Sequence, residues 1–278
     1  MVDVRLGLIG DNISRSQSPR LHRLAGKLCG LDVTYDRLIP GDMGLSFDAV
    51  FEHCAREGYR GINTTYPYKE KAITKARIDD PLVRAIGAVN TVLFEPDGPK
   101  GFNTDYSGFV AGYREVFGEA APGPVCMVGA GGVGKAIAFG LVALGIEELR
   151  VVERDIPKAQ GLARSLRAAR PGLRVSVTGS TAVAVAGACG LVNSTPVGMV
   201  GHDGTPIDKT LMRGAAWAFD AVYTPVDTQF LRDAEAAGLK VMSGYRLFFH
   251  QGVEAFRLFC GLEVDQSALR SGLMREAA

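Results

Sequence analysis

The chain has 278 residues, of which 47% are hydrophobic and 22% charged, and its formal net charge is +1. This composition excludes an intrinsically disordered chain, and the near-zero charge predicts no binding to nucleic acid or to an anionic membrane. The length favours two domains, and five scattered cysteines without a Cys-x-x-Cys pair favour a cytoplasmic protein with no metal site.

The first hundred residues alternate short apolar runs with segments whose apolar residues recur at a spacing near 3.6. Such alternation of strands and helices is typical of an α/β domain. Strands are expected at 4–10, 34–39, 61–65, 88–94 and 100–103. Helices are expected at 21–31, 47–58, 69–76 and 82–86.

A connecting helix at 106–117 and a turn at 121–124 lead into a second α/β cycle. Its strands are expected at 125–128, 149–153, 174–178, 190–193, 217–221 and 241–242. Its helices are expected at 132–144, 157–169, 181–188, 228–237, 245–260 and 266–275. The chain therefore predicts two α/β domains, the second with a parallel sheet.

The strand at 125–128 runs into a glycine-rich turn and then into an apolar helix. Gly129, Gly131 and Gly134 form a G-x-G-x-x-G pattern, with Ala130, Gly132 and Val133 between them. The three glycines allow a tight turn, close approach of a pyrophosphate and close packing of helix on strand. A purely structural glycine-rich turn is the alternative. The strand–turn–helix context favours a dinucleotide site, because the helix N-terminus offers free N–H groups to phosphates.

An acidic residue ends the second strand of this cycle, about 20 residues after the glycines, where a ribose-binding acid is expected. Glu153 would accept hydrogen bonds from the ribose diol and repel a 2′-phosphate, and Asp155 adds a second acid. Arg154 would attract that phosphate, or lie in solvent against the adenine. The acids favour NAD over NADP as the cofactor.

Several short motifs rich in polar residues resemble those of a known family. They are GDNISRSQSPRLH at 10–22, GINTTYPYK at 61–69, GAVNT at 87–91, NTD at 103–105, NSTPVGM at 193–199 and HQ at 250–251. In this order, over nearly the whole chain, they resemble the shikimate dehydrogenase family with its quinate/shikimate branch. The resemblance implies oxidoreduction between shikimate and 3-dehydroshikimate with a nicotinamide cofactor.

The resemblance assigns the proton relay to Lys69 and Asp105. Oxidation of a ring alcohol moves a hydride to the cofactor, so the protein must handle a proton and the charge on oxygen. Lys69 would give the proton to the carbonyl oxygen during reduction, and Asp105 would orient the lysine. The structural alternatives are a surface lysine that opens a helix and an aspartate that caps the helix from Tyr106.

Substrate contacts follow from the same resemblance. Ser16 and Ser18, two residues apart, would point the same way in an extended segment and bind one carboxylate; Ser18 capping the helix from Pro19 is the alternative. The resemblance assigns the binding of ring hydroxyls to Thr65, Asn90 and Gln251, and it implies that Tyr223 lies near the substrate carboxylate. The positions near the nicotinamide are Thr195, Val197, Met199 and Gly244. Since Gln251 lies late in the chain, the last helices are expected to fold back onto the first domain.

The predicted division is a substrate-binding domain at 1–105, completed by 243–278, and an NAD(P)-binding Rossmann-type domain at 106–242. The partner is a small cyclic hydroxy acid, and the protein is a monomer or a homodimer. Dehydrogenation of quinate or aminoshikimate stays open, as does a non-catalytic dinucleotide sensor of the same fold. A methylenetetrahydrofolate dehydrogenase shares the two-domain plan but gives no reason for the paired serines.

Overall fold

The structure is a computed structural model that describes residues 3–275. The chain forms two compact units. The first unit holds the described residues up to Thr104 and from Gln251 onward, and the second unit holds Asp105–His250. Within the described residues no helix has the length and apolar character needed to cross a membrane.

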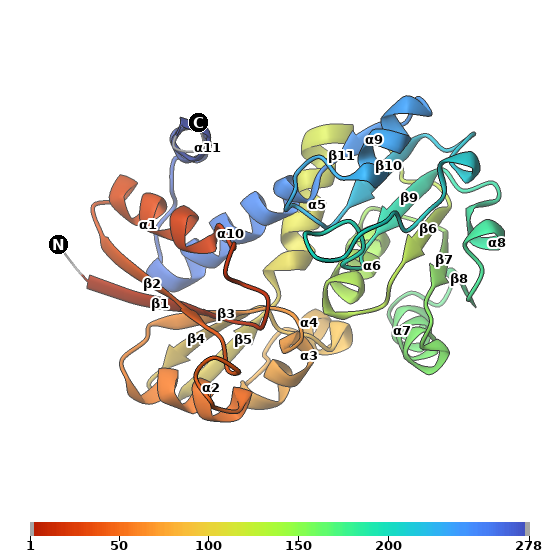
Figure 1. The fold of residues 1–278 in the computed structure, drawn as a ribbon. Coiled ribbons are helices and arrows are strands. Elements are labelled where there is room, and N and C mark those ends of the chain that lie inside the picture. Colours follow the sequence, from red (N-terminus) through yellow and green to blue (C-terminus); the bar gives the residue numbers. More distant parts are fainter. Residues whose placement is uncertain (1–2, 276–278) are drawn as a thin grey trace. The chain divides into compact units, whose positions relative to one another are not determined.

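The first unit contains a five-stranded sheet in the order β2-β1-β3-β4-β5 (Figure 1). Strands β1, β2 and β3 are parallel, whereas β4 is antiparallel to both β3 and β5. The strands are β1 Asp3–Ile9, β2 Asp32–Leu38, β3 Gly61–Thr64, β4 Thr91–Glu95 and β5 Gly98–Phe102. The helices are α1 Ser18–Leu28, α2 Phe47–Arg56, α3 Lys69–Ala72, the 3-10 turn η1 Ile73–Lys75, α4 Pro81–Ile86 and α11 Gln266–Arg275.

Apolar side chains from strands and helices fill the core of this unit. Ile9, Ile62 and Val92 project from three neighbouring strands and pack with Phe47 and Phe51 of α2. Each such fully buried side chain stabilises the fold by about 1.5–3 kcal/mol.

The end of α10 Gly244–Cys260 belongs to the first unit because it packs on the sheet there. Phe259 lies so close to Gly61 that a Cβ at this position would come within 2.5 Å of the ring. The Phe259 carbonyl also accepts a hydrogen bond from Arg60 Nε at 3.0 Å. The last helices therefore return to the first unit, as predicted.

The second unit contains a six-stranded parallel sheet in the order β11-β10-β9-β6-β7-β8 (Figure 1). The order reverses at β6, the arrangement of a Rossmann-type sheet with its switch point at the first strand. The strands are β6 Val125–Val128, β7 Glu148–Val152, β8 Arg174–Thr178, β9 Gly190–Asn193, β10 Trp217–Asp220 and β11 Lys240–Met242. The helices are α5 Thr104–Phe117, α6 Gly132–Ala143, α7 Ile156–Ala169, α8 Thr181–Val185, the 3-10 turn η2 Lys209–Leu211 and α9 Gln229–Ala236, followed by α10.

Several features differ from the sequence-based expectations. The helix expected at 69–76 ends at Ala72 and continues only as the 3-10 turn η1, and the turn η2 was not expected. Residues 243–250 also belong to the second compact unit, whereas the predicted division assigned them to the first domain. The predicted division separates substrate-binding from cofactor-binding residues, and it stays a prediction.

Candidate active site

Two loops leave the sheet of the first unit side by side. Ile9 at the end of β1 is in register with Thr64 at the end of β3, because the strands are parallel. The Thr65 N–H then donates to the Ile9 carbonyl at 2.9 Å. Gly10 permits this approach, since a Cβ there would lie 2.3 Å from Thr65 Cγ2. The serine loop, residues 11–17, and the segment 65–69 therefore start at one edge of the sheet.

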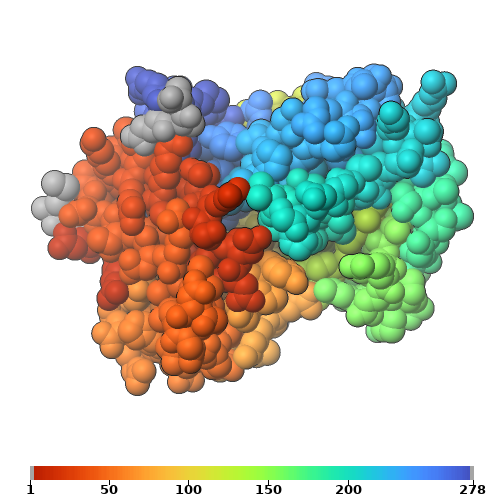
Figure 2. All heavy atoms as spheres, viewed as in Figure 1, coloured from red at the N-terminus to blue at the C-terminus, as the bar shows by residue number. Residues whose placement is uncertain are grey.

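The serine loop brings the two predicted hydroxyls together. Ser16 Oγ donates to Ser18 Oγ at 3.2 Å, and the Ser18 N–H donates to Ser16 Oγ at 3.3 Å. Both residues are 9% exposed, although the loop around them lies on the surface of the unit, at the red end of the colour scale in Figure 2. Arg37 of β2 holds the loop by donating from Nη2 to the Ser16 carbonyl at 2.9 Å.

The sequence-based reason for this pairing was wrong. The segment is not extended: Gln17, between the serines, has helical angles of φ −87° and ψ −1°. Ser18 is not the helix cap either, because α1 already includes it and Gln17 occupies the N-cap position without a side-chain bond. The helical conformation of Gln17, together with the hydrogen bond from the Ser18 N–H to Ser16 Oγ, brings the hydroxyls together instead.

Lys69 is half-buried and is the first residue of α3, directly after the segment that begins at Thr65. Two hydrogen bonds of Tyr68 hold the residues just before Lys69 in place. The Tyr68 N–H donates to Thr65 O at 2.7 Å, and the Tyr68 hydroxyl donates to Asp11 Oδ1 at 2.6 Å. That carboxylate raises the pKa of Tyr68 to about 12. Tyr68 and Asp11 thus join the lysine segment to the serine loop, a link that the sequence analysis missed.

Asn90 is the centre of a buried amide network, and it is 2% exposed. Its Oδ1 accepts from the Thr104 N–H at 2.7 Å, and its Nδ2 donates to Thr104 Oγ1 at 2.9 Å and to Gln251 Oε1 at 3.5 Å. The Asn63 amide group donates to Asn90 O at 3.1 Å and to Thr91 Oγ1 at 3.0 Å. The structure therefore brings Asn90 and Gln251 together, with Thr104 and Asn63 as supports that the sequence analysis missed.

Asp105 is 3% exposed and lies in the first turn of α5. The capping alternative for this aspartate was wrong, because the helix begins at Thr104, before Asp105. Its neighbour Thr104 is held by Asn90. Since Asp105 belongs to the second unit and Lys69 to the first, their pairing stays a prediction.

The glycine loop of the second unit is shaped by contacts beneath it. Gly129 has φ +102°, which favours glycine, and a Cβ on Gly134 would lie 2.8 Å from Ser194 Oγ and 3.0 Å from Gly129 O. Ser194 Oγ in turn donates to Val128 O at 2.8 Å and to Gly129 O at 3.0 Å. The first and third glycines are therefore required by the protein's own packing.

Gly131 differs from the other two glycines. It is the N-cap of α6 with φ −73° and ψ −174°, angles that any residue adopts. A Cβ built there would find nothing nearer than Lys158 Nζ at 3.9 Å. The packing of the chain thus leaves open space in front of the helix N-terminus, where N–H groups without intrahelical partners favour an anion. The predicted role of this loop in binding the pyrophosphate of a dinucleotide stays a prediction.

Glu153 follows β7 and reaches across to the glycine loop. Val152 pairs with Val128 in the sheet, so the residues after both strands emerge together. Glu153 Oε2 accepts from the Ala130 N–H at 2.9 Å, and Oε1 accepts from the N–H groups of Arg154 and Asp155 at 2.8 and 3.2 Å. The carboxylate is therefore fixed beside the loop, where a ribose reader is expected.

The neighbours of Glu153 have different surroundings. Asp155 caps α7, because its Oδ1 accepts from the Lys158 N–H at 3.1 Å, and Arg154 is exposed. Lys158, near the space before Gly131, was missed by the sequence analysis. The feature that could have pointed to Lys158 is its position in the first turn of a predicted helix, where the helix dipole disfavours a cation unless an anion is nearby.

The loop 193–199 leaves β9 at the same edge, since Asn193 is in register with Val128. Thr195 Oγ1 donates to Asn193 Oδ1 at 2.7 Å and accepts from the Val197 N–H at 3.2 Å. Met199 follows one residue after Gly198, which has φ +94°. Gly244 has a packing reason of its own, because a Cβ there would lie 2.5 Å from Val222 O.

Tyr223, His250 and His22 each contact other side chains of the chain. Tyr223 is half-buried and stacks on Phe248 with centroids 4.8 Å apart. His250 Nε2 lies 2.7 Å from Glu115 Oε2. His22 is 1% exposed and stacks on Tyr35 with ring centroids 4.8 Å apart.

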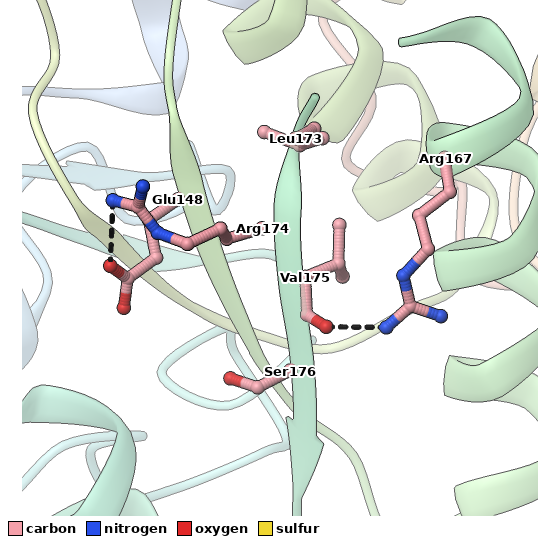
Figure 3. A pocket seen from close by; sticks show the side chains of 6 residues that line it. All are labelled: Glu148, Arg167, Leu173, Arg174, Val175 and Ser176. Carbon is pink, nitrogen blue, oxygen red and sulfur yellow. Dashed lines mark hydrogen bonds and ion pairs between the residues drawn. The ribbon is translucent and has the colours of Figure 1, made fainter. Parts of the chain in front are cut away.

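A surface hollow beside β8 does not form part of this site. It has a volume of about 450 Å³ and is lined by Glu148, Arg167, Leu173, Arg174, Val175 and Ser176. Figure 3 shows its arginines bound to the protein: Arg174 pairs with Glu148 at 3.3 Å, and Arg167 donates to the Val175 carbonyl. In residues 3–275 no group of three or more His, Cys, Asp or Glu side chains is arranged to hold a metal ion.

Comparison with known proteins places this arrangement in a family. The chain is 38% identical over 274 residues to the quinate/shikimate dehydrogenase (NAD(+)) of Corynebacterium efficiens, covering 96% of each chain. It belongs to the shikimate dehydrogenase family. A family model described as the shikimate dehydrogenase substrate binding domain matches residues 8–92, which include the serine loop, Lys69 and Asn90.

Both cofactor types occur among similar members of the family. The shikimate dehydrogenase (NADP(+)) of an Arthrobacter species is 35% identical, covering 98% of this chain and 95% of the relative. The quinate dehydrogenase of Corynebacterium glutamicum, solved in complex with NAD, superimposes with a TM-score of 0.88 at 35% identity, covering 98% of this chain and 99% of the other. The chain is therefore an oxidoreductase of the shikimate dehydrogenase family with a Rossmann-type second unit.

Proposed function

We propose that this chain interconverts shikimate and 3-dehydroshikimate, with the hydride passing to or from NAD. The observation that carries the proposal is the meeting of the serine loop and the Lys69 segment at one edge of the first sheet. This edge joins a pair of hydroxyls suited to a carboxylate with an amine suited to a ring hydroxyl. The similarity to shikimate and quinate/shikimate dehydrogenases over the whole chain supports it.

The first unit binds and orients the substrate. Ser16 turns its hydroxyl proton from Ser18 Oγ to the carboxylate, and the Ser18 hydroxyl donates to the carboxylate as well. Each such bond to a charged group is worth about 1.5–3 kcal/mol. Thr65 lies on the neighbouring segment and binds a ring hydroxyl. Asn90 and Gln251, held together by the buried amide network, bind the other hydroxyls, and Tyr223 contacts the substrate near its carboxylate.

Lys69 and Asp105 move the proton. During reduction the Lys69 ammonium donates a proton to the carbonyl oxygen as charge develops there. During oxidation the neutral amine takes the hydroxyl proton back. Asp105 orients the lysine and accepts a hydrogen bond from the hydroxyl, so both groups are needed for catalysis and neither is needed for a dinucleotide sensor.

The second unit holds the cofactor, whose nicotinamide supplies or accepts the hydride when bound. The N-terminus of α6 and the open space before Gly131 receive the pyrophosphate. Glu153 accepts hydrogen bonds from the ribose diol, and the loop with Thr195, Val197 and Met199, together with Gly244, borders the nicotinamide. The fixed carboxylate beside the loop supports NAD, whereas Arg154 and Lys158 are cations that favour a 2′-phosphate.

Quinate is the second candidate substrate. The 38% identical relative is named for both quinate and shikimate, and a quinate dehydrogenase is structurally similar along the whole chain. Quinate has the same carboxylate and ring alcohols to offer to the serine pair and Asn90. Aminoshikimate differs only at one ring substituent and stays a third possibility.

The direct test is steady-state oxidation of shikimate, quinate and aminoshikimate with NAD and with NADP, followed by the absorbance of the reduced nicotinamide. The proposal expects the highest kcat/KM for shikimate with NAD. Absence of turnover for all three acids with both cofactors would contradict it. A kcat/KM for quinate tenfold above that for shikimate would show that quinate, the second candidate, is the preferred substrate.

The cofactor preference has its own test in Glu153→Ser. Removal of the charge should raise the ratio of kcat/KM with NADP to that with NAD by tenfold or more, equivalent to about 1.4 kcal/mol. Glu153→Gln is the matched variant, because it is neutral but keeps an oxygen for the N–H groups of Arg154 and Asp155. A wild type that prefers NADP by tenfold would show that Arg154 and Lys158 outweigh the acid.

A further inference from the structure

A buried carboxylate that takes no part in the proposed chemistry lies at the end of β10. Asp220 is 0% exposed and is in register with Asn193 at the end of β9. Its Oδ1 accepts from Asn193 Nδ2 and from the Val222 N–H, both at 2.9 Å. Its Oδ2 accepts from Thr228 Oγ1 at 2.6 Å. Three separate pieces of chain therefore donate to one side chain.

The first of these pieces is the loop 193–199. The Asn193 Oδ1 accepts from the Thr195 N–H at 3.0 Å and from Thr195 Oγ1 at 2.7 Å. The Asn193 Nδ2, besides donating to Asp220, donates to Val197 O at 3.0 Å. The orientation of the Asn193 amide thus sets the shape of the loop, and Asp220 sets the orientation of the amide.

The other two pieces bracket the turn that carries Tyr223. The Val222 N–H immediately precedes Tyr223, and Thr228 is the N-cap of α9, where its hydroxyl accepts from the Leu231 N–H at 3.3 Å. The turn is also joined to the first loop directly, because the Val200 N–H donates to Thr224 O at 3.2 Å. Both ends of the turn are therefore bound to the same carboxylate.

The hydrogen bonds to Asp220 hold its carboxylate against the cost of burial. Burial raises the pKa of Asp220 to about 6, although the bonds from Thr228, Val222 and Asn193 oppose that rise. Removal of the carboxylate would leave the donors on Asn193, Val222 and Thr228 without their acceptor, so its loss would also cost stability. A side chain with several acceptor positions also fixes several donors relative to one another.

We propose that Asp220 is a positioning residue that holds the loop 193–199 and the Tyr223 turn in one arrangement. The inference rests on the proposed function, in which the loop borders the nicotinamide and Tyr223 contacts the substrate. Asp220 touches neither ligand. It acts through Asn193 on cofactor binding and through Val222 and Thr228 on substrate binding.

The test compares Asp220→Ala with Asp220→Asn. Alanine removes both carboxylate oxygens of Asp220. The KM for shikimate from steady-state kinetics and the Kd for NADH from isothermal titration should therefore each rise at least tenfold. Asparagine keeps Oδ1 for Asn193 and Val222, and its Nδ2 can donate to the Thr228 hydroxyl, so both values should stay within threefold of the wild type. An asparagine variant as impaired as the alanine variant would overturn the proposal.

A merely structural role gives a different result. In that case Asp220→Ala lowers apparent kcat with the folded fraction and leaves KM and Kd within twofold, which also overturns the proposal. Ser180→Ala is the matched control, because Ser180 caps α8 in the same unit through the Val183 N–H and lies outside both segments. Its KM and Kd should not change.

Two further measurements keep the test decisive. If Asp220→Ala does not fold, Thr228→Val removes the donor to Oδ2 and should raise the KM for shikimate at least threefold, while Thr228→Ser restores it; equal values for the two variants would overturn the proposal. Failure of the proposed function is seen separately as a wild type without shikimate turnover. In that event the titration with NADH still reports on the loop 193–199.

Discussion

At the scale of single residues, side chains predicted to bind ligands are first bound to one another. The Ser16 and Ser18 hydroxyls pair at 3.2 Å, and Asn90 is engaged by Thr104 and Gln251. Such mutual bonds keep polar groups satisfied in a largely buried place and hold them in position. The residue types and their order were predictable through the family resemblance. The supports Asn63, Thr104 and Tyr68 were not, because nothing in their spacing marks a long-range bond.

The serine pair gives a prediction about the substrate carboxylate. Ser16→Ala or Ser18→Ala should raise the KM for shikimate by ten- to a hundredfold, because each removes a bond of about 1.5–3 kcal/mol to a charged group. The Kd for NADH should stay unchanged. Competition by a carboxylate-free ring alcohol serves as the control. An equal loss of affinity for that alcohol would show that the serines act only on the fold.

His22 gives a prediction about pH. Burial lowers its pKa to about 3, from 6.5 in the unfolded chain, and Nδ1 has no hydrogen-bond partner among the described residues. Because the folded state rejects the proton, the stability due to neutral His22 is complete above pH 6.5 and is lost as pH falls toward 3. Between pH 7.5 and pH 5.0 this loss is about 2 kcal/mol.

His22→Phe should remove this loss while retaining a flat ring against Tyr35. Urea unfolding at the two pH values is the measurement. The wild type should lose about 2 kcal/mol more than the variant between them. Equal losses in both proteins would show that His22 does not titrate in this range.

At the scale of secondary-structure elements, the sequence pattern predicted nearly all the helices and strands and many of their first residues, but it misplaced the starts of α1 and α5. Helix α1 begins at Ser18 and helix α5 at Thr104, so Ser18 and Asp105, the residues expected as caps, lie inside a first turn. Capping depends on the backbone angles of one residue, and several neighbours of suitable type compete for that place. The paired serines were predicted to be close for the wrong reason, because a local turn replaced the expected extended segment.

The glycine loop gives a prediction that separates ligand from packing. Gly131→Ala should fold with unchanged stability, since the nearest atom to its Cβ is 3.9 Å away, but should weaken NADH binding at least tenfold. Gly134→Ala is the matched variant, and its Cβ meets Gly129 O at 3.0 Å. It should lose about 1–3 kcal/mol of stability through overpacking. A Gly131→Ala variant with normal NADH affinity would show that the open space in front of Gly131 is not part of the cofactor site.

At the scale of the whole molecule, the predicted site segments of each unit lie side by side because the parallel strands of each sheet end at a common edge. Ile9 and Thr64 align in one sheet, and Val128, Val152 and Asn193 align in the other. The alternation of elements predicted two α/β folds, but only the register shows which strand ends are neighbours. The return of the last helices to the first unit was predicted through Gln251, a resemblance-based position, since local patterns carry no such information.

The central claim is that this chain oxidises a ring alcohol with Lys69 as the proton-transfer group, and kcat for shikimate oxidation by Lys69→Ala tests it most directly. Removal of a general acid–base group should lower kcat by about 10²–10⁴-fold, with little change in KM. Lys71→Ala is the matched control, because Lys71 pairs with Asp48 at the surface at 2.7 Å, and its kcat should equal that of the wild type. A Lys69→Ala enzyme with near-normal kcat would contradict the account.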